Sequence, residues 1–221
     1  MSTLSEHAQW LASHQEEIID PQREIVDPHH HLWRHSGMEP YLLEDLWSDT
    51  NSGHNITHTV FIECGAEYFS AGPEHLRPVG ETEFVADIAS QSQDKGGASI
   101  SAIVARADLA HDALEEILIA HESAGGGFFR GIRHALARAP DGVELMIPGG
   151  AQQGLSEDPL FRGGVKFLGE RGFTYDSWHY HTQNRQFLGL AQAVPYTTMI
   201  LDHFGTPLGV GPFARSGGSS L

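Results

Sequence analysis

The stretch "EIVDPHHHLWRH" (residues 24–35) joins a short apolar run to an aspartate and three consecutive histidines. Its first residues include β-branched Ile25 and Val26, which favour a strand, and the polar residues follow at the carboxyl end of that strand. Side chains two residues apart share one face of a strand, so we expect His29 and His31 to point to one centre, with His30 on the other side.

Similar short apolar runs recur along the chain, separated by segments whose apolar positions fall at helical spacing. The expected strands are 24–27, 58–64, 100–107, 128–134, 172–178 and 197–203, and the intervening helical segments are 81–93, 110–123 and 181–194. This alternation predicts an α/β fold with a parallel sheet and crossover helices, either doubly wound or closed as a (β/α)8 barrel.

The position of the polar residues favours the barrel, because they lie at the carboxyl ends of the runs, where barrel enzymes place their chemistry. No glycine-rich fingerprint follows the first strand and no P-loop occurs, which disfavours a nucleotide-binding sheet. A closed TIM barrel has eight strands and typically about 250 residues. We therefore expect an incomplete (β/α)8 TIM barrel with about six of the eight β/α units, the front part of a longer protein.

The expected organisation is a helical N-terminal extension (1–23), a partial barrel domain (24–214) and a flexible tail (215–221). The chain has 29 acidic and 13 basic residues and a formal charge of −16, which repels phosphate backbones and anionic membranes. Neither nucleic acid nor a membrane is therefore an expected partner. No signal peptide or membrane span is recognisable, so the expected location is the cytoplasm.

The histidine pair suggests a metal site, because two neutral imidazoles at this spacing suit a divalent ion such as zinc. Asp27 lies on the same side and could ligate the ion or fix a histidine tautomer. A surface histidine cluster is the alternative. The segment "SWHYH" (177–181) repeats the spacing at His179 and His181 if the strand continues that far, and His203 ends the next strand. A barrel would bring these strand ends to one mouth.

Two charged residues at other strand ends have more than one interpretation. Glu63 could be a metal ligand, a general base or a strand-end charge. Arg133 offers a planar fork of donors that matches a substrate carboxylate, or it forms a salt bridge with one of the many acids. Cys64 is the single cysteine, which excludes an internal disulfide and a cysteine-based zinc site.

Five segments together resemble the amidohydrolase-2 (amidohydrolase-related) family of TIM-barrel hydrolases. The similarity is to its lactonase branch, that of 2-pyrone-4,6-dicarboxylate lactonase, L-fuconolactonase and 4-sulfomuconolactonase. The segments are "IVDPHHHLW" (25–33), which resembles the first-strand D-x-H-x-H signature, "VFIECGAEY" (60–68), "GFFRGIRHALARAPD" (127–141), "TYDSWHYH" (174–181) and "ILDHFGTPLGVGPFA" (200–214). They extend over most of residues 24–214.

The resemblance implies a hydrolase that opens a lactone, a cyclic ester, of a small acidic molecule by attack of water. It implies a divalent metal, zinc by preference, on His29, His31 and His181, although some members of the branch work without a metal. It also implies roles for the sixth-strand His203 and for Arg133 as the substrate-carboxylate contact. The eighth-strand aspartate of the family has no counterpart in this sequence.

The complete set of candidate residues adds others at the strand ends. The catalytic candidates are His203, Glu63 and Asp27, and the substrate contacts are Arg133, His134 and Trp33. A decarboxylase or hydratase on the same barrel is an alternative reaction, and an inactive truncated barrel is an alternative without catalysis. The expected partner is a small acidic lactone, and assembly into a homo-oligomer is left open.

Overall fold

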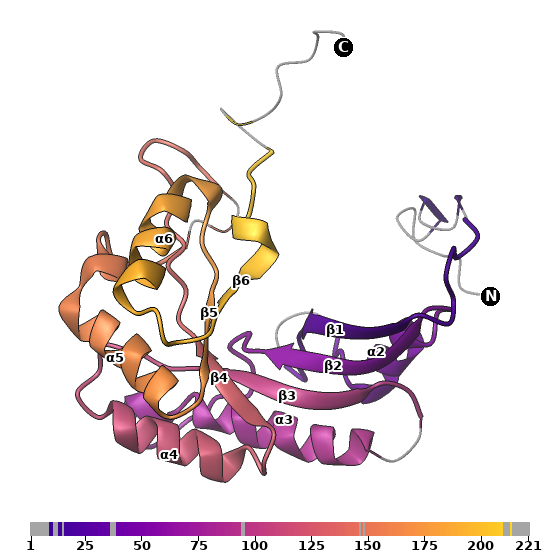
Figure 1. The fold of residues 1–221 in the computed structure, drawn as a ribbon. Coiled ribbons are helices and arrows are strands. Elements are labelled where there is room, and N and C mark those ends of the chain that lie inside the picture. Colours follow the sequence, from indigo (N-terminus) through magenta and orange to yellow (C-terminus); the bar gives the residue numbers. More distant parts are fainter. Residues whose placement is uncertain are drawn as a thin grey trace, which may run out of the picture.

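The computed structural model describes residues 9–10, 13–14, 16–35, 39–93, 96–145, 147, 149–209 and 213 (Figure 1). The expected tail at 215–221 lies outside the described residues, as do residues 1–8, 11, 12 and 15 of the expected N-terminal extension. No helix in the described ranges is long and apolar enough to span a bilayer.

A single parallel sheet of six strands organises the described part of the chain, with the strands in sequence order. The strands are β1 (Glu24–His30), β2 (Asn55–Ile62), β3 (Ser99–Arg106), β4 (Phe129–Arg133), β5 (Thr174–Ser177) and β6 (Met199–Leu201). Each strand pairs with its sequence neighbours, and β1 and β6 form the two edges of the sheet. The sheet curls like part of a barrel wall (Figure 1).

Helices connect successive strands and lie along one side of the curled sheet (Figure 1). They are α2 (Leu43–Thr50), α3 (Val79–Ser92), α4 (Leu114–Ala124), α5 (Pro159–Glu170) and α6 (Asn184–Ala193), with short 3-10 turns η1 (Glu74–Leu76), η2 (Leu155–Glu157), η3 (His181–Gln183) and η4 (Asp202–Gly205). The expected fold class, an incomplete (β/α) barrel of the TIM type, is confirmed.

Local sequence explains where individual elements begin. Helix α5 begins after Asp158, whose carboxylate accepts hydrogen bonds from the backbone N–H groups of Leu160 and Phe161, with Pro159 at the first helical position. The strand expected at 172–178 is shorter than predicted, and β5 ends at Ser177. The two histidines of "SWHYH" therefore lie beyond the strand.

Two apolar clusters bury the helices against the sheet. The first lies under α2 and α3 and contains Leu32, Leu43, Leu46, Phe61, Val85, Ile88, Ala89, Ile100 and Ile103. The second joins β3, β4 and β5 to the later helices and includes Ile117, Leu118, Ile132, Phe161, Val165, Leu168, Tyr175 and Leu190. Burying one such large side chain contributes about 1.5–3 kcal/mol, so these clusters hold the helices against the sheet.

Candidate active site

Three imidazole rings gather at the carboxyl ends of the two edge strands. The ring centroids of His29 and His31 are 4.9 Å apart, and those of His29 and His203 are 4.6 Å apart. The register of β1 against β2 shifts between Asp27 and His30, which marks a local irregularity at this end of the strand. The structure thus brings His29 and His31 together and adds His203 from η4.

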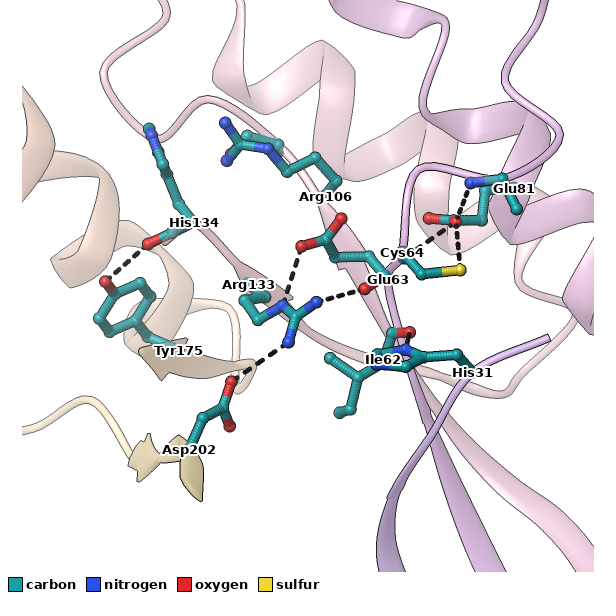
Figure 2. Close-up of polar contacts among 12 residues, drawn as sticks. His31, Ile62, Glu63, Cys64, Glu81, Arg106, Arg133, His134, Tyr175 and Asp202 are labelled. Atoms are coloured by element: carbon teal, nitrogen blue, oxygen red, sulfur yellow. Dashed lines mark hydrogen bonds and ion pairs between the residues drawn. The ribbon is translucent and has the colours of Figure 1, made fainter. Parts of the chain in front are cut away.

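The hydrogen bonds of these rings decide which nitrogen atoms are available. Nδ1 of His31 lies 2.8 Å from the carbonyl oxygen of Ile62 (Figure 2). A carbonyl can only accept, so Nδ1 carries the proton and Nε2 of His31 is left as an acceptor. Nε2 of His29 is buried and has no hydrogen-bond partner among the described residues. Two ring nitrogens can therefore serve a bound molecule.

The histidine pair is neutral at physiological pH. Burial, followed by the neighbouring His31, Arg133 and His203, lowers the pKa of His29 to about 3. Burial also lowers the pKa of His31. His30 is 7% exposed and packs edge-on against Phe61, with ring centroids 5.8 Å apart. The chemistry available at the pair is hydrogen bonding or ligation by neutral imidazole.

A buried ion-pair network connects three strand ends (Figure 2). Nε of Arg133 donates to Oε1 of Glu63 at 2.8 Å, and Nη2 donates to the backbone carbonyl of Glu63. Nη1 of Arg133 lies 3.5 Å from Oδ2 of Asp202. Arg133 is 8% exposed, so its guanidinium is largely engaged by the protein itself. Of the two interpretations of Arg133, the salt bridge is the one that the structure shows.

Two buried carboxyl groups in this region were not among the expected site residues. Asp176 and Asp202 are 3% and 4% exposed. Burial and the charge of Asp202 raise the pKa of Asp176 to about 7. Burial also raises the pKa of Asp202, although Arg133 opposes this effect. Asp176 and Asp202 each lie near the end of one of the last two strand-like runs of the sequence, and this position was the signal that could have identified them.

The chain after β6 adopts an unusual backbone conformation. His203, Phe204 and Thr206 have positive φ angles of 50°, 54° and 42°. Non-glycine residues adopt this left-handed region at a cost, and such residues cluster where the surrounding structure fixes a functional geometry. In this turn, Asp202 contacts Arg133 and the next residue, His203, contacts His29.

The structure does not bring His181 to the histidine pair. His181 begins η3, its Nδ1 accepts from the backbone N–H of Leu208 at 3.2 Å, and its ring meets Phe213 edge-on. Because β5 ends at Ser177, His181 is four residues beyond the strand. His179 is fully buried, with its ring nitrogens joined to Ser177 and Asn184.

The expected three-histidine metal set is therefore not assembled in the part of the chain that the structure describes. There, no group of three or more His, Cys, Asp or Glu side chains is placed so that it could hold a metal ion. His29 and His31 fit an ion as two neutral nitrogen ligands, but no further His, Cys, Asp or Glu side chain of the described residues, His203 included, is placed to complete a set of three.

The remaining expected site residues have local partners. Asp27 accepts the backbone N–H of His29 at 3.1 Å. The ring of Trp33 stacks on Tyr41 at 5.4 Å, its Nε1 donates to the carbonyl of Glu39, and it lines a cavity of 360 Å³ together with the histidine pair and Asp27. Trp33 is thus near enough to contact a molecule bound at this cavity.

His134 is held in the wall of the sheet. It is 9% exposed, and its Nδ1 accepts the backbone N–H of Leu109 at 3.1 Å. Its backbone carbonyl accepts the hydroxyl of Tyr175 at 2.9 Å (Figure 2). Burial, and then the charge of Arg106, lower the pKa of His134 to about 4. These contacts tie His134 to the backbone of the sheet wall, and its role as a substrate contact stays a prediction.

Comparison with known proteins adds a likeness of fold. No family model matches the sequence. The uncharacterized protein y4mH of Sinorhizobium fredii is 29% identical over 165 residues, which are 75% of this chain and 50% of that protein. This chain thus spans about half the length of the curated relative that it matches.

Several solved structures share the arrangement of strands and helices. An amidohydrolase from Burkholderia multivorans, crystallised with bound zinc, is 22% identical with a TM-score of 0.59, over 82% of this chain and 58% of that chain. Amidohydrolase 2 from Bifidobacterium longum subsp. infantis is 15% identical with a TM-score of 0.53, over 86% and 65%. A Pseudomonas putida protein proposed to be a 2-pyrone-4,6-dicarboxylic acid hydrolase is 15% identical with a TM-score of 0.50, over 81% and 57%. At these identities the likeness concerns the fold: the described residues have the fold of amidohydrolase structures.

Proposed function

We propose that this chain belongs to a hydrolase of the amidohydrolase type that opens the lactone of a small acidic molecule by attack of water. The observation that carries the proposal is the meeting of imidazole rings from the end of β1 and from η4 near the buried carboxyl of Asp202. The fold supports it, because barrel enzymes place their chemistry at this end of the sheet. One similar structure is proposed to be a hydrolase of a 2-pyrone, which is itself a cyclic ester.

We assign the general base to Asp202. Its pKa is raised by burial, so it takes a proton from water more readily than an ordinary aspartate does. The carboxylate of Glu63 forms an ion pair with Arg133, and Arg133 in turn contacts Asp202. Glu63 and Arg133 are then positioning residues that hold the base and tune its charge.

His29 in β1 and His31, which directly follows β1, have different roles in this mechanism. Nε2 of His31 can only accept, which suits it to hold the attacking water. The unbonded Nε2 of His29, when it carries the proton, donates to the carbonyl oxygen as negative charge develops there. Water adds to the carbonyl carbon and gives its proton to Asp202. The ring C–O bond then breaks, and the same proton passes to the leaving oxygen, which yields a hydroxy acid.

The experiment measures hydrolysis of a panel of neutral and acidic lactones by the full chain, with added zinc and after treatment with EDTA. We expect hydrolysis of acidic lactones that survives EDTA, and a loss of at least about 100-fold in kcat/KM for Asp202→Asn, in line with the usual contribution of a general base. The exposed His35→Asn variant is the matched control and should keep its rate. Absence of hydrolysis with every lactone, with and without zinc, would defeat the proposal. Loss of activity in EDTA would contradict the metal-free mechanism.

A further inference from the structure

A second cavity lies beside this site, at the carboxyl end of β3. Its volume is 530 Å³, and its lining includes Tyr68, His75, Arg77, Arg106, Asp108 and His111. Arg106 is the last residue of β3 and lies next to Glu63 and Arg133 at the same end of the sheet (Figure 2). The cavity is within the usual size range of small-molecule sites, about 300–1,000 Å³.

The two arginines of this cavity are not neutralised. The guanidinium of Arg106 donates to the carbonyl oxygen of Ala107 at 2.9 Å, and within the described ranges neither Arg106 nor Arg77 forms an ion pair with a carboxylate. This is unexpected in a chain with 29 acidic and 13 basic residues. Arg133 contrasts with them, because two carboxylates already surround its guanidinium.

The acids of the lining do not cancel these charges. The carboxylate of Asp108 accepts the backbone N–H of Ala110 at 3.0 Å and lies 3.7 Å from Nδ1 of His134. Glu74 is exposed and forms no ion pair within the described ranges. Since no carboxylate of the described residues pairs with either guanidinium, both can bind an anion from solution.

Tyr68 supplies a further hydrogen-bond donor to the lining. Burial raises the pKa of Tyr68, so its hydroxyl stays protonated and can donate a hydrogen bond. The rings of His75 and His111 stack with centroids 4.8 Å apart, and Nε2 of His75 lies 3.5 Å from Glu116. Planar arginine forks together with a phenol match the two oxygens of a carboxylate.

We propose that this cavity is the subsite for a carboxylate of the substrate, bound by Arg106 and Arg77, with Tyr68 as a further donor. The inference rests on the proposed function, since it places the acidic part of the lactone beside the cluster of His29, His31 and Asp202. It moves carboxylate recognition away from Arg133. A substrate anion bound here would overcome the repulsion of the strongly negative chain through local pairing.

Calorimetric titration of the full chain at low salt tests the subsite without any turnover. The probes are succinate, its neutral dimethyl ester and inorganic phosphate. We expect saturable binding of succinate, no binding of the ester, and at least tenfold weaker succinate binding by Arg106→Gln and by Arg77→Gln. The matched control is Arg185→Gln, which removes an equal charge from an exposed position on α6 that does not line the cavity.

Several outcomes would overturn the subsite. The parent chain could bind no succinate at all, or Arg106→Gln and Arg77→Gln could bind succinate as tightly as the parent chain does. Arg185→Gln could weaken succinate binding as much as the two cavity variants do. Phosphate could bind the parent chain more tightly than succinate does. Arg106→Lys keeps the charge but removes the planar fork, so it should bind succinate more weakly than the parent chain with an unchanged melting temperature. Failure of lactone hydrolysis would leave this result intact, because binding is measured directly.

Discussion

Arg133 joins the ends of three strands because its guanidinium carries donors in several directions. Glu63 follows β2 and Asp202 follows β6, and both lie against this one side chain from β4 (Figure 2). A largely buried guanidinium is unfavourable unless carboxylates neutralise its charge, and a buried carboxylate is unfavourable unless a positive charge lies beside it. The partners of Arg133 come from positions 70 and 69 residues away in the sequence, which is why the sequence alone left its role open.

Removal of this guanidinium should destabilise the protein. Arg133→Gln leaves Glu63 and Asp202 buried without their counter-charge, and we expect a loss of about 3–5 kcal/mol in the free energy of unfolding. Urea denaturation followed by circular dichroism measures it. Arg130→Gln on the same strand is the control, because Arg130 is exposed and contacts only backbone carbonyls. If both variants lost the same free energy of unfolding, the ion pairs of Arg133 would not be a particular source of stability.

Glu81 is a buried carboxyl that should make stability depend on pH. It is 1% exposed, and its Oε1 accepts the backbone N–H groups of Cys64 and Ala66, whereas burial raises its pKa from 4.5 to about 7. As pH rises, the unfolded chain loses this proton first. The contribution of Glu81 is therefore most favourable below about pH 4.5 and declines until about pH 7.

We expect Glu81→Gln to remove this decline. The shift corresponds to roughly 3 kcal/mol, so the stability difference between pH 5 and pH 8 should change by up to that amount relative to the parent chain. Urea denaturation at the two pH values measures the change. Glu83→Gln, an exposed position on the same helix, should leave the difference unaltered. A pH profile that is identical for Glu81→Gln and the parent chain would exclude a raised pKa.

At the scale of elements, helix α5 packs closely because of one glycine. A Cβ at Gly164 would lie 1.9 Å from the carbonyl oxygen of Leu109, in the segment before α4, whereas a Cβ at Gly163 would meet nothing within 4 Å. Gly164→Ala should lower the free energy of unfolding by about 1–3 kcal/mol through overpacking. Gly163→Ala should raise it by up to about 1 kcal/mol through helix propensity. Thermal or urea denaturation of the pair checks the opposite signs.

The turn η4 contains a non-glycine residue, Phe204, in the left-handed backbone conformation. Phe204 has a φ angle of 54° and is 90% exposed, so its side chain gives little in return for the backbone cost. Phe204→Gly should raise the free energy of unfolding by about 0.5–1 kcal/mol, because glycine adopts this conformation without steric cost. Phe204→Ala keeps the cost and should change stability little. Stabilisation by alanine as well would point to the side chain as the cause.

At the scale of the whole molecule, the order of six strands and the barrel type could be predicted from the alternation of apolar runs and helical segments. The pairing of His29 with His31 followed from their spacing on a strand. The position of His181 did not, because β5 ends at Ser177 and the chain turns into η3. The carboxyl of Asp202 was overlooked, since its burial and its contact with Arg133 depend on segments far apart in the sequence.

The strands become shorter along the sheet, from eight residues in β2 and β3 to five, four and three in β4, β5 and β6. Amide protons of β3 should therefore exchange with deuterium slowest, and those of β6 fastest, because the edge strand can open without unfolding the centre. Asp202 and His203 follow this least protected strand. A ligand that needs them would have to close this edge each time it binds, and it should slow exchange at Met199–Leu201 more than anywhere in β3.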